Sequence, residues 1–558
     1  MSGPISSAAL LHNGKLIAAA PEERFSRIKH DRSFPHRALD YCLGEARIQL
    51  GQVDCFSIAW NPGENIALKY RSGFSDWMRY PGEWLTSVPN HLLPGLLIPQ
   101  STEQKFINDK GHQVAIEYVD HHLAHARLVF HASGFKDAAI VIVDGWSEQK
   151  TTSIFHGKGD NLALQESETF PNSIGCVYAA ITQFLGFRPF SDEWKVMGMA
   201  AYGHPANIPQ IAKLIHVEEN GRYEVNLKYF DFFNFDRPEM YGKRLVELFG
   251  KPRAPNEPIL PHHFDLAAAM QQLLETVLVG ILNRAHRLTN ATHVCFAGGV
   301  AMNCLFNGTI TSRTPFSRCY VGFAPDDSGN SIGAAIDSSI RRNVNIKSSS
   351  INSAVGPGFD QSIIGDTLEK FKLPHRRSNN IASEVANLIA KGLVVGWFQG
   401  RAEFGQRALG HRSILANPLD ASIKSKLNAS VKYREEFRPF APMLPYSLMT
   451  QYFNTQDTDP VLFMEKAFRF RPEVIEDLPG VAHADGTGRL QTVLEENEPL
   501  LHELLLKFKE KTQTAILINT SFNTNGEPIV ASPEDALRTY TTSGLDALAI
   551  GDFLLTKQ

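Results

Sequence analysis

The chain has 558 residues, more than one hydrophobic core usually holds, so at least two domains are expected. Its formal net charge of -4 at pH 7 gives no basic excess, which argues against a nucleic acid as the main partner. The six scattered cysteines form no C-x-x-C pair, and neither a signal-peptide pattern nor an apolar run of about eighteen residues is present, so we expect a cytoplasmic protein without a membrane span.

Two similar strand patterns indicate a repeated unit in the first half of the chain. Apolar runs at 7–11 and 16–20 flank an Asn-Gly pair at 13–14, which predicts a β-hairpin. A strand at 138–143, a tight turn and a second hairpin at 151–164 repeat the pattern. Because helical stretches follow each copy, we expect a duplicated α/β domain of the actin and sugar-kinase type.

The residues between these patterns contain a predicted helix at 35–46 and a predicted strand at 53–59. From 64 to 104 the chain is rich in aromatic residues and proline, with weak periodicity. This segment is either a cover over a cleft or a surface insertion, and both interpretations stay open.

Three histidines follow the strand-like run 114–119. If the next residues are helical, His121 and His125 lie four apart on one face, where both imidazoles can bind one metal ion. Asp144 ends a second strand-like run, so its carboxylate is expected at a neighbouring strand tip, where open α/β sheets place ligands. The ordinary alternative is a solvated turn with a core imidazole bonded to the backbone. The position at strand ends favours the metal site.

A glycine pair lies between the predicted strand 294–297 and a helix. Gly298 and Gly299, followed by Asn303, would let a nucleotide phosphate or ribose approach backbone N–H groups at the helix N-terminus. Such pairs also occur in ordinary turns.

A long amphipathic helix is predicted at 263–288, and a strand at 320–324. Asp327 follows this strand. Its carboxylate is either a further oxygen ligand beside the histidines or a helix N-cap, and the pattern leaves both open.

A polar stretch at 341–359, rich in serine and asparagine, is the predicted linker, which gives domains at 1–345 and 346–558. In the second domain, three arginines alternate with three glycines over 400–412. Forked guanidinium donors suit a phosphate or carboxylate, although exposed salt-bridged turns would explain each cation alone. Together they predict an oxyanion pocket, whose candidate residues are Arg407, Lys432, Arg438, Arg489, Ser521 and Asn523.

Seven ordered sequence blocks resemble the NodU/CmcH-type O-carbamoyltransferase family, and the resemblance covers almost the whole chain. The blocks are EERFSRIKHD, DHHLAHA, EWKVMGMAAYG, GGVAMNC, GRAEFGQRALGHRSILANP, FRPFAP and INTSFNTNGEPIV. The resemblance implies an actin-like (ASKHA) N-terminal domain, similar to the tRNA threonylcarbamoyl transferases, and a YrdC-like α/β C-terminal domain.

The resemblance also implies the reaction and its partners. The second domain would bind carbamoyl phosphate and ATP, with Mg²⁺, and form a carbamoyl-adenylate. The carbamoyl group would then pass to a hydroxyl of a small-molecule acceptor in the metal-containing first domain. A closed route between the two sites is expected, because the adenylate would hydrolyse in water.

Residue by residue, the family's metal ligands correspond to His121, His125, Asp144 and Asp327, with Fe(II) as the implied ion. Two imidazoles and two carboxylates also suit Mn or Zn, so the sequence itself does not choose. The carbamoyl phosphate contacts correspond to the six residues of the predicted oxyanion pocket, of which Arg407 and Lys432 are the candidate catalytic cations.

The N-terminus departs from the family pattern. Members begin with a short strand and a His-Asp pair, whose His is thought to help deprotonate the acceptor hydroxyl, but Pro4 and Ile5 stand here. The base is then another group, either His122 or a metal-bound hydroxide, or the acceptor is handled differently. The sequence identifies neither the acceptor nor the oligomeric state, and a homodimer stays open.

Two other functions remain as alternatives. An actin-like kinase or ATPase would phosphorylate a small molecule and release ADP without carbamoyl phosphate, and it leaves the arginine-rich second domain unexplained. A regulator that binds carbamoyl phosphate or a nucleotide, and that lost its base at Pro4 and Ile5, would bind ligand without turnover.

Overall fold

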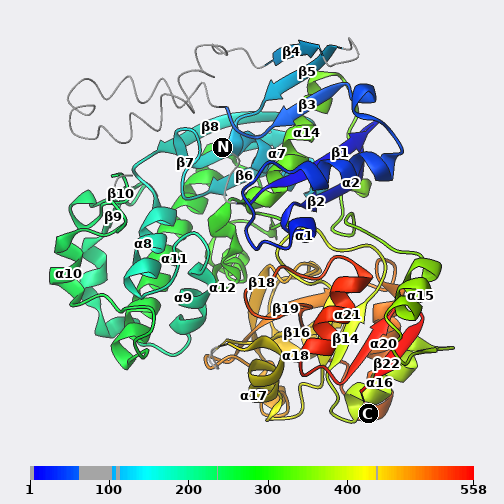
Figure 1. Cartoon of the computed structure of the whole chain (residues 1–558). Coiled ribbons are helices and arrows are strands. Elements are labelled where there is room, and N and C mark those ends of the chain that lie inside the picture. The colour runs from blue at the N-terminus through cyan, green and yellow to red at the C-terminus, as the bar shows by residue number, and fades with distance from the viewer. Residues whose placement is uncertain (1–4, 62–102, 108–112, 235–236, 435–437, 558) are drawn as a thin grey trace.

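A computed structural model describes residues 5–61, 103–107, 113–234, 237–434 and 438–557. Pro4 and residues 64–102 of the predicted cover segment lie outside these ranges. Within them the chain forms a mixed α/β structure with five sheets, arranged in two halves (Figure 1).

The predicted N-terminal hairpin is confirmed by the antiparallel pairing of β1 (Ser7–His12) with β2 (Lys15–Pro21). Asn13 and Gly14 have φ values of 50° and 75°, which a tight hairpin turn requires. A Cβ atom on Gly14 would lie 1.9 Å from the carbonyl oxygen of Asn345, so the turn packs directly on the predicted linker.

Three further sheets complete the first half, of which one is the short antiparallel pair of β10 (Tyr223–Val225) with β9 (Ile215–Val217). Of the other two, the smaller has the order β3-β5-β4, with β3 (Cys55–Ile58), β5 (Gln113–Tyr118) and β4 (Glu103–Ile107). The larger has the order β12-β11-β6-β7-β8. Its strands are β6 (Asp137–Val143), β7 (Lys150–Lys158), β8 (Asn161–Thr169), β11 (His293–Ala297) and β12 (Arg318–Tyr320). Because β6 and β11 are parallel, their carboxyl ends meet at one edge of the sheet.

The two predicted copies differ in strand pairing. In the described part of the chain, the β1–β2 hairpin is separate from the β3-β5-β4 sheet, whereas the later unit is one continuous five-stranded sheet. The duplication of an actin-type domain therefore stays a prediction, as does the domain boundary after residue 345.

Helices cover both faces of the five-stranded sheet because the side chains of β6 alternate. Ile140 and Ile142 pack with α7 (His121–Ser133), and Val141 and Val143 pack in the cluster built by the opposite helices. Those opposite helices are α8 (Ile174–Phe184) and α11 (Pro261–Thr289). The shorter elements of this half are α1 (Glu23–Ser26), α2 (His36–Ala46), α9 (Glu193–Ala200), β9 (Ile215–Val217), β10 (Tyr223–Val225), α10 (Lys243–Phe249), α12 (Cys304–Asn307), α13 (Ile310–Arg313) and α14 (Asn330–Arg341).

Helix α11 is, among the described residues, the one helix long and apolar enough to cross a membrane by length and composition. Its apolar window is 67% buried inside the protein, where Leu274 and Leu278 join the core of the first half. Core helices of this kind pass the same test, so the helix is weak evidence for a membrane span.

The second half is a three-layer structure around a ten-stranded sheet with the order β13-β22-β21-β14-β15-β20-β16-β19-β18-β17. Trp397 on β14 faces one helical layer and Phe398 faces the other. The strands are β13 (Arg376–Arg377), β14 (Val395–Phe398), β15 (Arg412–Ala416), β16 (Ala441–Pro445), β17 (Phe453–Asn454), β18 (Lys466–Phe470), β19 (Thr487–Val493), β20 (Leu517–Ser521), β21 (Ala547–Ile550) and β22 (Phe553–Thr556). The helices are α15 (Gln361–Lys370), α16 (Ile381–Ala390), α17 (Ile423–Leu427), α18 (Met449–Tyr452), α19 (Pro472–Ile475), α20 (Pro499–Thr512) and α21 (Pro533–Thr542).

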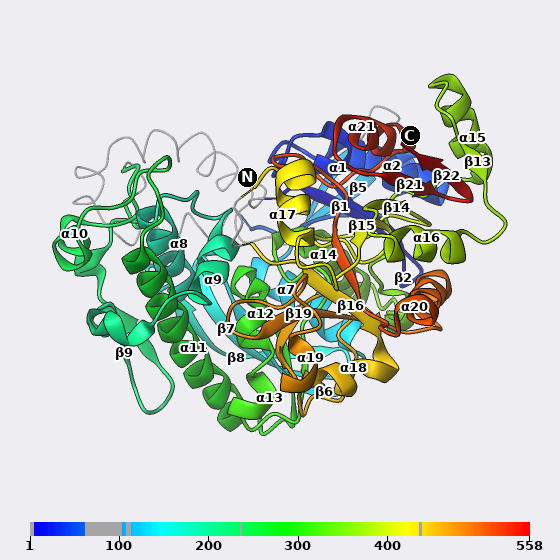
Figure 2. The ribbon, with the colours of Figure 1, turned by 90° about the horizontal axis from the view of Figure 1, so that it is seen from below.

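The two halves contact each other closely where α12 meets β18, with β19 beside it (Figures 1 and 2). Asn307 donates its side-chain amide to the carbonyl of Glu465 at 2.8 Å. A Cβ atom on Gly308 would lie 2.0 Å from the carbonyl oxygen of Ala467, so only glycine permits this approach. A cavity lies between the halves beside this contact.

Candidate active site

The histidine cluster lies at the start of α7, as the sequence predicts. Asp120 caps this helix, because its Oδ1 accepts the backbone N–H of Leu123 at 2.9 Å. Lys150 donates to the other oxygen of Asp120 at 2.5 Å. The cap fixes the first turn of the helix, so the side chains of His121 and His125 project from one face toward the carboxyl edge of the sheet.

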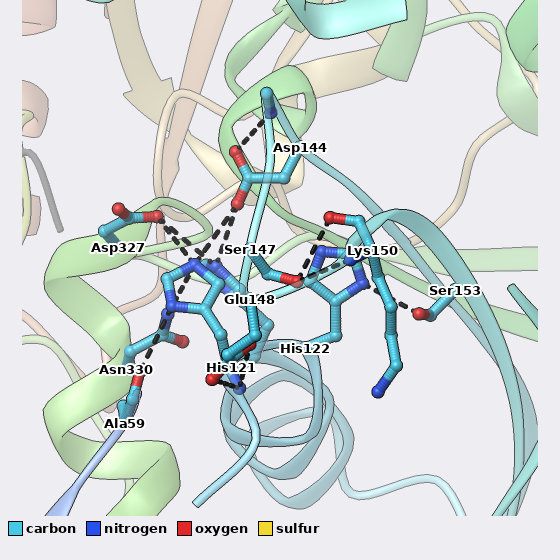
Figure 3. A network of polar contacts seen from close by, with 12 residues as sticks. Ala59, His121, His122, Asp144, Ser147, Glu148, Lys150, Ser153, Asp327 and Asn330 are labelled. Atoms are coloured by element: carbon cyan, nitrogen blue, oxygen red, sulfur yellow. Dashed lines mark hydrogen bonds and ion pairs between the residues drawn. The ribbon is translucent and has the colours of Figure 1, made fainter. Parts of the chain in front are cut away.

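Four predicted metal ligands converge at this edge. Three of them, His121, Asp144 and Asp327, are labelled in Figure 3. His121 Nε2 lies 3.5 Å from Asp144 Oδ2 and 3.3 Å from Asp327 Oδ1. His125 Nε2 lies 3.3 Å and 3.5 Å from the same two oxygens, and all four atoms lie within 4.8 Å of one another. Nitrogen and oxygen therefore alternate around a centre, each about 2.1–2.4 Å away, which matches coordination distances of divalent ions.

The electrostatics of this cluster fit a cation. Burial alone would lower the pKa of His121, but Asp327 and Asp144 outweigh it and raise that pKa well above its ordinary value. The same imidazoles lower the pKa of Asp144 against its burial. Among the described residues, His125 Nε2 and Asp144 Oδ2 are buried without a hydrogen-bond partner. Two imidazoles and two carboxylates with unused lone pairs are a donor set that suits Fe, Mn or Zn.

Neighbouring groups hold the first histidine in place, and the sequence analysis did not identify them. The His121 Nδ1 atom lies 3.2 Å from the carbonyl oxygen of Ala59, which fixes the ring orientation. Glu148 accepts the backbone N–H of His121 at 3.2 Å and that of Asn61 at 2.8 Å. Asn330 lies against the His121 ring (Figure 3). These contacts are long-range, so no local sequence pattern encodes them.

His122 is not one of the four clustered side chains and contacts a neighbouring strand instead. Its Nδ1 atom lies 2.7 Å from the hydroxyl of Ser153 on β7, and the residue is 0% exposed. Burial, followed by the proximity of His121, lowers the pKa of His122 to about 3, so its ring is neutral. Its predicted role as the base for the acceptor stays a prediction, and the enclosure of the ring gives it no open path to an acceptor.

The predicted nucleotide-contacting glycines lie against the metal ligands. A Cβ atom on Gly298 would lie 2.3 Å from the carbonyl oxygen of Val143, and one on Gly299 would lie 3.0 Å from Asp144 Oδ1. Asn303 caps α12 and exchanges two side-chain hydrogen bonds with Gln271. The structure thus gives these three residues packing and capping contacts, and their contact with a phosphate or ribose stays a prediction.

A cavity of about 210 Å³ between the halves brings together most of the predicted oxyanion residues. The first half supplies Lys29, His30 and Trp194, which the sequence analysis did not identify. The predicted residues that line this cavity are Arg407, Arg438, Arg489, Ser521 and Asn523. Ser328, next to a predicted metal ligand, also lines it, so the cavity extends toward the metal cluster.

Several cations in this cavity form no direct ion pair with a described carboxylate. Among the described residues, the side chains of Arg407, Arg489 and Lys29 form no hydrogen bond or ion pair. Burial, followed by the nearby Arg489, lowers the pKa of Arg407 to about 9. Arg438 stacks over the ring of Trp194 at 3.9 Å. Arg407 and Arg489 are partly buried and Lys29 is exposed, so like charges gather at one cavity, an arrangement that suits an anionic ligand.

Lys432 is placed differently from these arginines. Its ammonium group donates to the carbonyl and hydroxyl of Ser521 and, at 3.0 and 2.9 Å, to the carbonyl and side-chain oxygens of Asn523. Burial, with Arg434, Arg438 and Lys29 nearby, lowers the pKa of Lys432 well below its ordinary value. In this arrangement Lys432 fixes the loop that presents Ser521 and Asn523 to the cavity.

A direct contact links the two sites. The side chain of Gln406 donates to Asp326, whose other oxygen accepts the hydroxyl of Ser328 at 2.5 Å. Gln406 precedes Arg407 in the cavity, and Asp326 precedes Asp327 in the metal cluster. Burial raises the pKa of Asp326 to about 6.

Comparisons with known proteins identify the family of the chain. Two family models match, "Carbamoyltransferase N-terminus" over residues 5–336 and "Carbamoyltransferase C-terminus" over residues 386–557. Nodulation protein NolNO of Sinorhizobium fredii is 35% identical over 99% of this chain and 79% of its own. The 3'-hydroxymethylcephem-O-carbamoyltransferase of Amycolatopsis lactamdurans is 32% identical over 66% of this chain and 65% of its own.

A protein of Synechocystis, sll1178, is 34% identical over 99% of this chain and 95% of its own. Among solved structures, HypF of T. kodakarensis aligns with a TM-score of 0.22 and 10% identity over 43% of this chain and 38% of that chain. A score this low supports no comparison of folds.

Proposed function

Since the chain belongs to the carbamoyltransferase family, we propose that it joins a carbamoyl group to AMP in the cationic cavity and transfers it to an alcohol at the His–Asp cluster. Carbamoyl phosphate and ATP are the proposed co-substrates. The unpaired cations of Arg407 and Arg489 carry the first half of this proposal, because they require an anionic ligand.

The proposed first step makes an activated acyl group. Hydrolysis of carbamoyl phosphate gives carbamate and phosphate, and a carbamate oxygen then attacks the α-phosphorus of ATP, with pyrophosphate as the leaving group. Arg407, Arg489 and Arg438 would neutralise the phosphate charge that accumulates in this cavity. The loop held by Lys432 would present Ser521 and Asn523 as neutral donors.

The proposed second step takes place at the cluster of His121, His125, Asp144 and Asp327. A divalent ion held there, proposed as Fe(II), would polarise the carbamoyl carbonyl. The acceptor oxygen attacks the carbamoyl carbon, the bond to AMP breaks, and the acceptor proton leaves to a base. The relative from A. lactamdurans is named for a hydroxymethyl acceptor, which supports an alcohol here.

The two halves of the proposal predict different defects. Arg407→Ala should abolish the release of pyrophosphate that depends on carbamoyl phosphate. His125→Ala should leave this release intact and abolish carbamoyl transfer. Transfer is measured by mass spectrometry as the gain of a carbamoyl group on a panel of hydroxylated metabolites. If both variants transfer normally, the assignment of the sites is wrong.

The same assay separates the alternatives. An actin-like kinase would release ADP from ATP without carbamoyl phosphate, and a non-catalytic regulator would bind both ligands without forming AMP. The family membership and the cation cluster favour the transferase over both.

A further inference from the structure

Asn330, the first residue of α14, presents a primary amide beside the metal cluster (Figure 3). The residue is 3% exposed, and among the described residues its Oδ1 atom has no hydrogen-bond partner. Its Nδ2 atom lies 3.3 Å from both ring nitrogens of His121. Equal distances to both nitrogens place the amide over the ring, outside the directions of the nitrogen lone pairs.

The His121 ring cannot satisfy this amide. Its Nδ1 atom must carry a proton to donate to the carbonyl of Ala59, 3.2 Å away. Its Nε2 atom faces the carboxylates of Asp144 and Asp327, where an ion or a proton is held. Both ring nitrogens are therefore used, so the amide NH2 of Asn330 has only this contact with the ring, and its Oδ1 acceptor has no partner among the described residues. Buried polar groups without partners are unfavourable, so the arrangement calls for a ligand with complementary hydrogen bonds.

A carbamoyl group has this complementarity. It carries an NH2 donor and a carbonyl acceptor side by side, in the same geometry as the Asn330 amide, so the two can form a pair of hydrogen bonds. An acetyl group of nearly the same size lacks the donor. We propose that Asn330 recognises the NH2 group of the carbamoyl unit at the transfer site and selects it against other acyl groups, an inference that rests on the proposed function.

Two stable adenylate analogues test this role without turnover. They are 5'-O-(N-carbamoylsulfamoyl)adenosine and 5'-O-(N-acetylsulfamoyl)adenosine, which differ by NH2 in place of CH3. Calorimetry on the metal-loaded full chain should show the carbamoyl analogue binding about 10–100-fold tighter, because a site built to hydrogen-bond a group discriminates against its absence. In Asn330→Leu and Asn330→Ala this ratio should fall to near one.

Ser331→Ala is the matched control, since this neighbouring hydroxyl is bonded to Ser7 instead. It should keep the wild-type ratio. The metal content of every variant is measured, so a loss of ion can be separated from a loss of selectivity. An unchanged ratio in both Asn330 variants, or an equal loss of affinity for both analogues with loss of metal, would overturn the proposal.

The proposed function can fail separately. If the wild-type protein binds neither analogue and forms no AMP from carbamoyl phosphate and ATP, the proposed function is wrong. If AMP forms but the wild-type protein binds both analogues equally, the recognition of the carbamoyl group by Asn330 is refuted, and the proposed function is not.

Discussion

Replacing Arg407 by methionine should stabilise the ligand-free protein while abolishing its response to carbamoyl phosphate. Burial, followed by the nearby Arg489, lowers the pKa of this guanidinium to about 9. One pKa unit corresponds to about 1.4 kcal/mol, so keeping the side chain charged costs at most about 5 kcal/mol. Arg407 is only partly buried, and solvent screening reduces the expected gain to about 1–3 kcal/mol.

Arg412, on the strand that follows the same loop, is the matched control, and its substitution should change the stability of the ligand-free protein in the opposite direction. It is 0% exposed, and its guanidinium donates to the carbonyls of Gln399, His411, Pro357 and Gly400. Arg412→Met removes the side-chain donor of the Gln399 and Gly400 carbonyls, while the carbonyls of Pro357 and His411 keep backbone N–H donors. We therefore expect a loss of about 3–5 kcal/mol. The contrast tests the effect of pairing, because both substitutions remove one arginine, of which Arg412 has hydrogen-bond partners and Arg407 has none among the described residues.

Thermal unfolding with and without carbamoyl phosphate measures both effects. For a unit the size of the second half, 1 kcal/mol corresponds to a shift in Tm of about 2–4 °C. Ligand at about a hundred times its Kd adds about 2.7 kcal/mol to the wild-type protein. Arg407→Met should show a raised Tm without ligand and no ligand shift. The assignment of Arg407 to the anion site would be refuted if Arg407→Met had a lower Tm than the wild-type protein without ligand. It would also be refuted if carbamoyl phosphate raised the Tm of this variant as much as that of the wild-type protein.

Four further predictions concern the neighbouring groups. Fe(II), Mn²⁺ or Zn²⁺ should raise the Tm of the wild-type protein but not of Asp327→Asn, which loses one anionic ligand; an equal rise in both would contradict the ligand set. Metal affinity, measured by calorimetry, should rise with pH, because the pKa of His121 is raised without metal and its proton must leave on binding. Gln406→Glu should repel Asp326 and reduce transfer at least about tenfold more than pyrophosphate release, and an equal reduction of both would exclude coupling through this contact. Lys432→Met should lower the Tm by several degrees even without ligand, since the four hydrogen bonds from its ammonium group to Ser521 and Asn523 are lost, and an unchanged Tm would place Lys432 on the phosphate instead.

The local elements were predictable because their signals are local. The Asn-Gly turn at 13–14 predicts the hairpin that β1 and β2 form, and apolar spacing predicts α11. The i, i+4 pair His121 and His125 predicts two imidazoles on one helical face, and the structure adds Asp144 and Asp327 from two strand ends. For these residues spacing and chain position carry enough information.

Contacts between distant segments were not predictable in the same way. Glu148 holds the backbone of His121 from 27 residues away, and Asn330 reaches its ring from 209 residues away. Lys29 lies in a motif that the family resemblance includes, but no pattern within the chain places it beside Arg407. The glycine pair Gly298–Gly299 indicates close approach correctly, yet its nearest neighbours are the backbone of β6 and Asp144 rather than a ligand.

The loop that carries Arg407 is held by both halves of the chain, which explains why both reactions are proposed for one polypeptide. Arg24 donates to the carbonyl of Gly405 at 2.8 Å, and Arg401 donates to the carbonyl of Ile17 at 3.1 Å. The first-half partners in these two bonds, Arg24 and Ile17, lie in or directly after the N-terminal hairpin. Gln406 in the same loop also donates to Asp326, which precedes the predicted metal ligand Asp327. The arginines that line the cavity repel one another. Contacts from the first half therefore hold them together when no anion is bound. The same contacts place the cation-lined cavity near the four predicted metal ligands, so an acyl-adenylate formed as proposed would reach the proposed transfer site without crossing bulk water.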